Sequence, residues 1–438
     1  MRRVVLAVAV LIPLVALVAW AFTHEPSGTA EAPAGYWVSA YGDDAGDGSS
    51  RHPWRSVTKA VSAVPEGATI HLRGGDYRPF TVDRPGLTIT SAPGEKATIV
   101  GQSGTRDVIL VTDDHVTLRN LEVRGCVPNP APDAAETGDH GSGVRIHGTT
   151  GVTVQNVHVH HSAGTTAAGL PVGCYGILAT DARDLTVSGN EVDHNGAGIV
   201  VSGGGRGVLV DGNTVHDQDR IIHNTAAPLD DFGGYGLAAT FVEDDPGPVF
   251  RNNTVTHNLG PSTDYGVDGG GIEIYDAGHV TITGNTFADN DGALETGTGS
   301  GGGCDGNVFA GNTVATRDHG DDRSTGLVLR CAADMRVTGN TFENLSQFTF
   351  LISTDGDFAG RIDGLTITGN DVRQAPGVVV HRLQVPSTAS LPRITIDANR
   401  YRLAGASFAV IGPDDSPDAA NTVDFATWQQ RTRFDATS

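Results

Sequence analysis

The chain has 438 residues, of which 59 are glycine, and its formal net charge is −22. A surface this acidic repels the phosphates of nucleic acids and of anionic membranes, so the sequence excludes both as partners. The length would suffice for two or three ordinary domains, whereas a solenoid of this length is one domain because it grows by adding coils.

The first segment is typical of export signals. Two arginines at positions 2 and 3 precede an apolar run over residues 4–22, and residues 19–21 form an Ala-x-Ala cleavage site. The run is about as long as a membrane span, but Pro13 and the modest length favour a cleaved signal peptide over an uncleaved anchor. We therefore expect 1–22 to be the only possible membrane contact of a protein that is extracellular or tethered to the outer face of the cytoplasmic membrane. Residues 23–35 are expected to be a flexible linker.

Residues 36–100 are expected to form an N-terminal cap and the first coils. Residues 36–39 predict a strand, residues 54–64 space their apolar side chains for one face of a short helix, and residues 69–72 predict a second strand. A cap is needed because the end of a stack of strands exposes an unpaired edge and an apolar cross-section.

A four-residue phrase that starts with Gly-Asn or Asn-Asn recurs through the middle of the chain. Each copy follows a short β-branched run, and the closest copies are 23 residues apart. A unit this short cannot bury its own apolar face, so successive units must stack. Gly and Asn tolerate the left-handed backbone of a bend, and stacked asparagines are expected to form a ladder inside the turn. The copies lie at residues 189–192, 212–215, 252–255, 284–287, 311–314, 339–342 and 369–372.

This pattern predicts a parallel β-solenoid over residues 101–400, with coils about 4.8 Å apart. The motif resembles the right-handed parallel β-helix of the pectin-lyase-like superfamily, in its secreted and mostly uncharacterised bacterial branch, over residues 36–438. The resemblance implies an all-β, single-stranded right-handed parallel β-helix with an N-terminal cap helix. It also implies that residues 401–438 cap the other end, with Trp428 packed on the final coil. The superfamily contains lyases, hydrolases, epimerases and phage adhesins, so the fold leaves the activity open.

The four cysteines are expected to form two structural disulfides, because export permits them. Four cysteines allow three pairings. Cys304 and Cys331 are 27 residues apart, about one coil, so they are expected to lie side by side on adjacent coils. Cys126 and Cys174 then pair with each other and close a loop of about two coils.

Three insertions interrupt the regular spacing, at residues 127–141, 217–234 and 259–270. Loops on a rigid scaffold are where binding and catalysis usually lie. The second and third insertions end in similar Asp- and Gly-rich sequences directly before strands of one type, so we expect both loops at the same edge of one sheet, one coil apart. Aromatic rings gathered at this edge would form either a platform for sugar rings or ordinary packing. Candidate substrate-binding residues are Asp231, Phe232, Tyr235, Asp264, Tyr265 and Tyr275.

Two glutamates are predicted to stack on the solvent face of that sheet. The apolar Ile272 and Ile274 must point inward, so Glu273 points outward. On the next coil, alignment of Leu294 with Ile272 brings Glu295 into the same outward row. Stacked carboxylates repel each other unless a proton, a cation or an arginine relieves the repulsion.

This acidic cluster has three interpretations. The first is an acid/base pair of Glu273 and Glu295, with Asp268 as an alternative partner. The second is a Ca²⁺ site that adds Asp264 and Asp268. The third is a solvated acidic surface. Arg330 lies one coil beyond Glu295, where it would clamp a substrate, neutralise Glu295 or form an ordinary salt bridge. Ca²⁺ is the one cofactor that the sequence suggests.

Histidines recur in the turns of the coils. His158 and His160 are expected on one outward face, either as a metal pair or on an exposed bend. His194, His216 and His257 are expected at equivalent positions after successive turns, as a structural row.

The leading hypothesis is a secreted glycoside hydrolase acting on a polysaccharide, because glycosidic cleavage uses two carboxylates. The alternative is a Ca²⁺-assisted lyase on a uronate polymer with Arg330 as base. A lysine base is disfavoured, because the only lysines, Lys59 and Lys96, lie near the N-terminus. A third alternative is a non-catalytic cell-surface carbohydrate-binding or structural protein. In each case the partner is a glycan, and the protein is expected to be a monomer.

Overall fold

A computed structural model describes residues 33–128, 140–165, 171–223, 232–262, 266–299, 303–317, 323–354, 356, 358–385, 393–412 and 421–438. Residues Gly35–Ser438 form one compact unit. The predicted signal segment and most of the predicted linker lie outside the described ranges. Neither helix within these ranges is long and apolar enough to cross a membrane.

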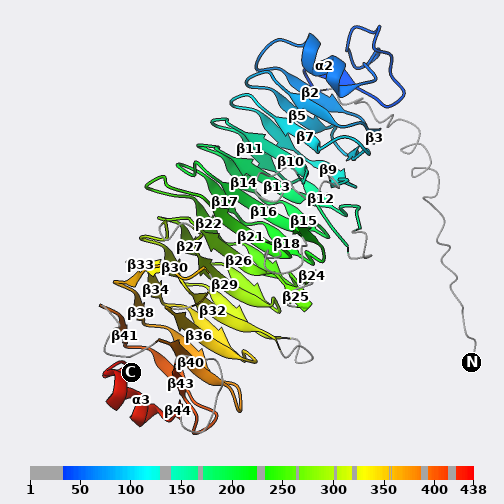
Figure 1. The fold of residues 1–438 in the computed structure, drawn as a ribbon. Coiled ribbons are helices and arrows are strands. Elements are labelled where there is room, and N and C mark those ends of the chain that lie inside the picture. The colour runs from blue at the N-terminus through cyan, green and yellow to red at the C-terminus, as the bar shows by residue number, and fades with distance from the viewer. Residues whose placement is uncertain are drawn as a thin grey trace, which may run out of the picture. The chain divides into compact units, whose positions relative to one another are not determined.

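The compact unit is a stack of coils in which each regular coil adds one strand to each of three long parallel sheets (Figure 1). We call them sheets A, B and C. Sheet A contains β1 (Tyr36–Val38), β2 (Thr69–Leu72), β5 (Thr88–Ser91), β8 (Thr117–Arg119), β11 (Thr153–Gln155), β14 (Thr186–Ser188), β17 (Leu209–Asp211), β22 (Val249–Arg251), β27 (Thr281–Thr283), β30 (Val308–Ala310), β34 (Arg336–Thr338), β38 (Thr366–Thr368) and β41 (Thr395–Asp397).

Sheet B follows sheet A along each coil. It contains β3 (Gly75–Tyr77), β6 (Ala97–Val100), β9 (Leu121–Arg124), β12 (His158–His160), β15 (Glu191–Asp193), β18 (Thr214–His216), β23 (Thr254–Thr256), β28 (Thr286–Ala288), β31 (Thr313–Ala315), β35 (Thr341–Glu343), β39 (Asp371–Arg373) and β42 (Arg400–Arg402).

Sheet C completes each coil and has the longest strands. It contains β4 (Phe80–Val82), β7 (Asp107–Val111), β10 (Ser142–His147), β13 (Tyr175–Thr180), β16 (Ala197–Ser202), β21 (Tyr235–Thr240), β26 (Gly270–Tyr275), β29 (Gly292–Gly297), β32 (Thr325–Leu329), β36 (Phe348–Ser353), β40 (Val379–Gln384), β43 (Ala409–Gly412) and the antiparallel β44 (Thr422–Val423). The predicted all-β parallel solenoid is therefore confirmed.

Within the described ranges, three further strand pairs lie outside the coils proper. Two are antiparallel hairpins, and the third is a short parallel pair. They are β19 (Ile221–His223) with β20 (Phe232–Gly233), β24 (Gly260–Ser262) with β25 (Gly266–Asp268), and β33 (Ala332–Ala333) with β37 (Ile362–Asp363).

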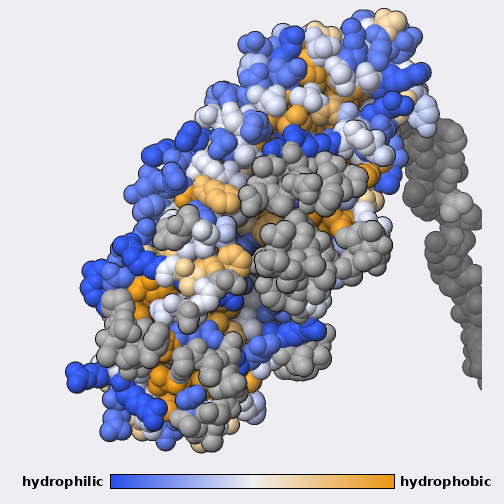
Figure 2. Space-filling view, viewed as in Figure 1, coloured by the Kyte–Doolittle hydropathy of each residue, from blue (hydrophilic) through white to orange (hydrophobic). Residues whose placement is uncertain are grey.

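The core is a column of apolar side chains that repeats at each coil. In sheet A the middle residue of each short strand points inward, as Val187, Val210 and Phe250 do in three successive buried positions. The residue that follows each of them is polar, Ser188, Asp211 and Arg251, and Arg251 is exposed. In Figure 2 the left flank, where the sheet A strands lie in Figure 1, is accordingly largely hydrophilic. The period-2 alternation of the sequence thus sets which face of each strand is buried.

The predicted asparagine ladder is present. The side-chain amide of Asn213 donates to Oδ1 of Asn253 at 2.9 Å, and Asn253 donates to Asn285 at 2.9 Å. Each backbone N–H on the ladder donates to the same oxygen of the next rung, as Asn213 does at 2.9 Å. The ladder runs through Asn190, Asn213, Asn253, Asn285, Asn312, Asn340, Asn370 and Asn399.

Both predicted disulfides are present, Cys126–Cys174 and Cys304–Cys331. The second joins adjacent coils, as expected. The first also joins adjacent coils, because Cys126 follows β9 and Cys174 precedes β13. Its 48-residue separation is one coil lengthened by insertions, and the expected two-coil span is wrong.

A helix covers each end of the stack (Figure 1). At the N-terminal end, α2 (Val57–Ala63) begins at the cap residue Ser56, whose hydroxyl accepts from the N–H of Lys59. It is shorter than the predicted 54–64. At the C-terminal end the tail forms α3 (Phe425–Thr432), a helix that the sequence did not predict. Trp428 of α3 is buried and stacks on His381 of β40 at 4.7 Å, which confirms its packing on the final coils.

Candidate active site

Glu273 and Glu295 are register partners on the adjacent strands β26 and β29 of sheet C. Their apolar neighbours Ile272, Ile274 and Leu294 are buried in the core, so both carboxylates lie on the outer face of the sheet. The predicted register is confirmed. Adjacent parallel strands are about 4.8 Å apart, so the two acids stand one coil rise from each other.

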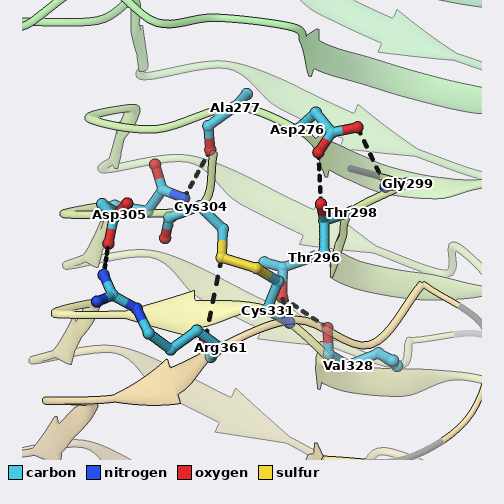
Figure 3. Close-up of a disulfide and its surroundings, with 11 residues drawn as sticks. Asp276, Ala277, Thr296, Thr298, Gly299, Cys304, Asp305, Val328, Cys331 and Arg361 are labelled. Atoms are coloured by element: carbon cyan, nitrogen blue, oxygen red, sulfur yellow. Dashed lines mark hydrogen bonds and ion pairs between the residues drawn. A yellow bond between two sulfur atoms is a disulfide. The ribbon is translucent and has the colours of Figure 1, made fainter. Parts of the chain in front are cut away.

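Arg330 forms an ion pair with Glu295. It directly follows β32, and its backbone N–H donates to the carbonyl oxygen of Thr296 at 3.2 Å. The next residue, Cys331, is joined to Cys304 in the loop after β29 (Figure 3). The disulfide therefore fixes the coil that carries Glu295 to the coil that carries Arg330. Both ion-paired side chains keep about a third of their surface exposed, 31% and 32%, so the ion pair is open to solvent.

Two tyrosines that begin sheet C strands, Tyr175 of β13 and Tyr235 of β21, are affected by the charge of Glu273. Burial raises the pKa of the Tyr235 phenol well above its usual range, the charges of Asp268, Glu273 and Asp291 raise it further, and Arg330 lowers it. Burial also raises the pKa of Tyr175, again with a contribution from Glu273. Three carboxylates and one guanidinium thus influence the phenol of Tyr235.

The two loops that lead into β21 and β26 lie against each other, as their similar sequences predicted. The hairpin β19–β20 precedes β21, and the hairpin β24–β25 precedes β26. A Cβ on Gly269 would lie 2.5 Å from the carbonyl oxygen of Gly234, and a Cβ on Gly234 would lie 2.4 Å from the nitrogen of Gly260. Glycine is therefore required for this approach, which brings Asp268 to the start of β26. Asp231, Asp264 and Tyr265 lie outside the described residues.

The expected aromatic platform divides into two groups. Tyr235 is buried and stacks on Phe232 at 5.8 Å, so these two residues are packing groups at the start of the strands. Tyr275 is not at that edge, because it ends β26, and the expectation of one shared edge is wrong. Tyr275 instead contacts Phe241 and Phe358 edge to face, at 5.8 and 5.9 Å.

The outer face on either side of the acids is apolar. Leu178, Val200 and Ala238 occupy the outward positions of three preceding strands. They are buried, because Ile222 of the β19–β20 hairpin and the half-buried Phe232 pack over them. On the following coils, Leu351, Phe348, Val379 and Val410 form a second apolar cluster. The acids thus occupy a polar gap between two apolar clusters.

Four side chains of this region were missed by the sequence analysis: Tyr175, Phe241, Asp291 and Phe358. Asp291 directly precedes β29 and offered a usable signal, an acidic turn before the strand of Glu295. The other three carry no local signal, because only stacking of coils brings them near β26.

The expected Ca²⁺ site is described only in part, because Asp264, one of its four expected ligands, lies outside the described residues. Among the residues that the structure describes, groups of three ligand atoms within 4.8 Å of one another occur on sheet B and not beside Glu273 and Glu295. Ca²⁺ takes six to eight oxygens, and the guanidinium of Arg330 already neutralises Glu295.

The chain was compared with known proteins. Its sequence matches a family described as a right-handed β-helix region over residues 96–314 and 229–400, and a family described as a protein of unknown function (DUF1565) over residues 40–91. No curated protein matches the sequence significantly.

Several solved structures are similar in fold. The catalytic unit of a thermostable GH87 α-1,3-glucanase from Streptomyces thermodiastaticus strain HF3-3 has a TM-score of 0.53 and 19% identity, over 89% of this chain and 68% of that chain. A GH136 lacto-N-biosidase from Eubacterium ramulus has a TM-score of 0.49 and 15% identity, over 84% of this chain and 67% of that chain. Pectate lyase Pel9A has a TM-score of 0.44 and 14% identity, over 78% of each chain. At these identities the likeness shows the fold.

Proposed function

The chain belongs to the right-handed β-helix family, and we propose that it is an exported glycoside hydrolase whose catalytic centre is the carboxylate pair on sheet C. The observation that carries the proposal is the register pairing of Glu273 with Glu295, together with the ion pair of Glu295 with Arg330. The likeness in fold to an α-1,3-glucanase supports a carbohydrate substrate.

The surroundings of the two acids suggest different roles. The guanidinium of Arg330 favours the ionised form of Glu295, which suits a nucleophile. Glu273 lies one coil from that negative charge, and one of its carboxylate oxygens is buried. Burial favours the protonated form, which suits a general acid.

These roles give a double-displacement reaction. Glu273 donates its proton to the glycosidic oxygen while Glu295 attacks the anomeric carbon, and the leaving sugar departs. Glu273 then takes a proton from water, whose oxygen replaces Glu295 at the anomeric carbon. One coil rise of about 4.8 Å is close to the roughly 5–5.5 Å between the carboxylates of retaining enzymes, so the product should keep its configuration. Inversion would instead indicate Asp268 as the partner of Glu295.

The aromatic side chains at the far end of the strands are suited to bind the sugar chain. Phe241 is 52% exposed and contacts Tyr275, which in turn contacts Phe358. Tyr275 is two residues beyond Glu273 on β26. The apolar face of a sugar ring that packs on these rings would lie beside the carboxylates.

A lyase with Arg330 as base is less well supported. An ion pair with Glu295 stabilises the protonated guanidinium, which does not give up its proton in proteins. The pairing instead suits a residue that holds Glu295 ionised and contacts the substrate.

The test is a screen of the purified protein on α-1,3-glucan, other neutral polysaccharides and uronate polymers. New reducing ends without ultraviolet absorbance indicate hydrolysis, and an absorbing unsaturated product indicates a lyase. Glu273→Gln and Glu295→Gln should each lower turnover by about 10²-fold or more without unfolding the protein. Glu343→Gln is the matched control, because Glu343 is also ion-paired with an arginine, Arg373 at 3.3 Å, but on sheet B.

The hydrolase assignment fails if both site variants keep full activity on a substrate that the parent protein cleaves, or if Glu343→Gln is as damaging as either. Binding of a polysaccharide without any product would support the non-catalytic alternative.

A further inference from the structure

A second cluster of ionisable side chains lies on sheet B, on a different face of the solenoid from the carboxylate pair. Glu122 comes from β9, His158 and His160 come from β12, and Asp193 comes from β15. His161 directly follows β12. The three strands are neighbours in the sheet, so the cluster spans three successive coils.

Glu122 orients His160. Its Oε2 is 2.8 Å from Nζ of Lys96 and accepts from the hydroxyl of Thr98 at 2.6 Å. Its Oε1 is 2.9 Å from Nε2 of His160. An ion-paired carboxylate only accepts hydrogen bonds, so Nε2 carries the imidazole proton and Nδ1 presents its lone pair. A carboxylate behind a histidine in this way is the usual support of a metal-binding histidine.

The Nδ1 lone pair of His160 faces other ligand atoms. Its Nδ1 is 2.7 Å from Nδ1 of His161, and Nδ1 of His161 is 3.8 Å from Oδ1 of Asp193. The other oxygen of Asp193 is 2.6 Å from Nε2 of His158, so His158 positions Asp193 as Glu122 positions His160. Tetrahedral Zn²⁺ with bonds of about 2.0–2.2 Å separates its ligand atoms by roughly 3.4 Å, which lies between the two observed ligand spacings.

We propose that His160, His161 and Asp193 bind a divalent transition-metal cation, preferentially Zn²⁺. Two imidazoles and a carboxylate are ligands that Zn²⁺ accepts, and their three ligand atoms all lie within 4.8 Å of one another. His194 adjoins this group, since its Nδ1 is 2.7 Å from Oδ1 of Asp193 and its ring stacks on His161 at 4.6 Å.

The metal would cross-link β12 to β15 close to the Cys126–Cys174 disulfide. The N–H of Gly125 donates to the carbonyl oxygen of His160 at 3.2 Å, and the N–H of Ala163 donates to that of Cys126 at 2.7 Å. The cation and the Cys126–Cys174 bridge would therefore hold the same part of the solenoid, where insertions lengthen the coil. We infer a stabilising role for the cation.

The expected equivalence of three later histidines is wrong in part, and this supplies a control. His161, His194 and His257 share a left-handed backbone position after their strands, with φ of 54°, 51° and 55°. His216 lies one residue earlier, level with His160. The residue before His257 is a threonine, whereas the residue before His161 is His160. His257 therefore has the same backbone conformation as His161 but lacks a neighbouring imidazole that could share a metal with it.

The experiment is calorimetric titration of Zn²⁺ into the chelator-treated full chain, with metal analysis of the product. We expect one Zn²⁺ per chain and a higher melting temperature with Zn²⁺. His161→Asn should weaken binding by more than 100-fold, and Glu122→Gln by about 10–100-fold. His257→Asn, which keeps a residue tolerant of the left-handed backbone, should bind as the parent does.

The proposal is overturned if the parent binds no stoichiometric Zn²⁺, which would mean that the two imidazoles share a proton. It is also overturned if His161→Asn binds normally or if His257→Asn loses binding equally. None of these readouts depends on glycosidase activity.

Discussion

Replacement of one rung of the asparagine ladder should be among the most destabilising single changes in this protein. Asn253 is buried, and its side chain makes four hydrogen bonds. Oδ1 accepts from the backbone N–H and the side-chain amide of Asn213, and Nδ2 donates to Oδ1 of Asn285 and to the carbonyl oxygen of Val210. Asn253→Ala would remove all four bonds without admitting water.

The magnitude follows from the groups left behind. The N–H of Asn213 and the carbonyl oxygen of Val210 each lose a buried partner, and a buried polar group without its partner costs about 1–3 kcal/mol. Asn253→Ala should therefore lower the free energy of unfolding by roughly 2–6 kcal/mol. Asn252→Gly is the control, because Asn252 is exposed, has φ of 55°, and its amide donates to Asp211. Its cost should be within about 0.5 kcal/mol.

The assay is urea unfolding together with hydrogen exchange of the Asn213 amide, which reports local opening if the solenoid does not unfold in one step. A loss of 2–6 kcal/mol would accelerate exchange at that amide by roughly 30-fold to 10⁴-fold, since each 1.4 kcal/mol is a factor of ten. Equal effects of Asn253→Ala and Asn252→Gly would refute the view that the ladder stabilises the coils.

Three further predictions concern pH, cross-linking and substrate binding. Burial lowers the pKa of His381 from 6.5 to about 4. Between these two pH values the unfolded state binds a proton that the folded state does not. The free energy of unfolding should therefore be unaffected above pH 6.5 and should fall by about 3 kcal/mol as the pH drops to 4. His381→Phe should flatten the urea-midpoint profile over that window, and an unchanged slope would contradict the assignment. Removal of the second disulfide by the double substitution Cys304→Ser and Cys331→Ser should lower the free energy of unfolding by roughly 3–4 kcal/mol, given its 27-residue separation. Turnover should fall as well. Full activity would show that the ion-paired Arg330 does not need the disulfide to hold its position. Phe241→Ala should raise KM several-fold with little change in kcat, measured on whichever polysaccharide the parent cleaves, and an unchanged KM would remove the aromatic row from the binding site.

Features with a short period were predictable from the sequence. The strands, the buried alternation and the asparagine ladder all follow from a repeat that returns at each coil. The register of Glu273 with Glu295 was predictable for the same reason, because 22 residues separate them without an insertion. The Cys304–Cys331 pairing was likewise set by a spacing of about one coil.

Features that depend on insertions or on side-chain reach were not predictable. A second buried ladder of amides, Asn195, Gln218, Asn258 and Asn290, has no repeated phrase to reveal it, since a glutamine replaces one asparagine. The tail was expected to cap the stack, but nothing in the sequence indicated that it would add the helix α3 to the strands β43 and β44.

The sequence by itself determined the solenoid and the row on which the two acids stand, because these depend on hydrophobic alternation and on the bends between strands. Only the tertiary structure decided what surrounds that row. It placed Arg330 on Glu295, buried Tyr235 beneath Phe232, moved Tyr275 to the opposite end of its strand, and assembled the sheet B histidines with carboxylates of neighbouring coils. The physical reason is that residues 20–40 positions apart become neighbours only after each coil has closed. The contacts made then depend on insertion lengths and side-chain rotamers, which have no period in the sequence.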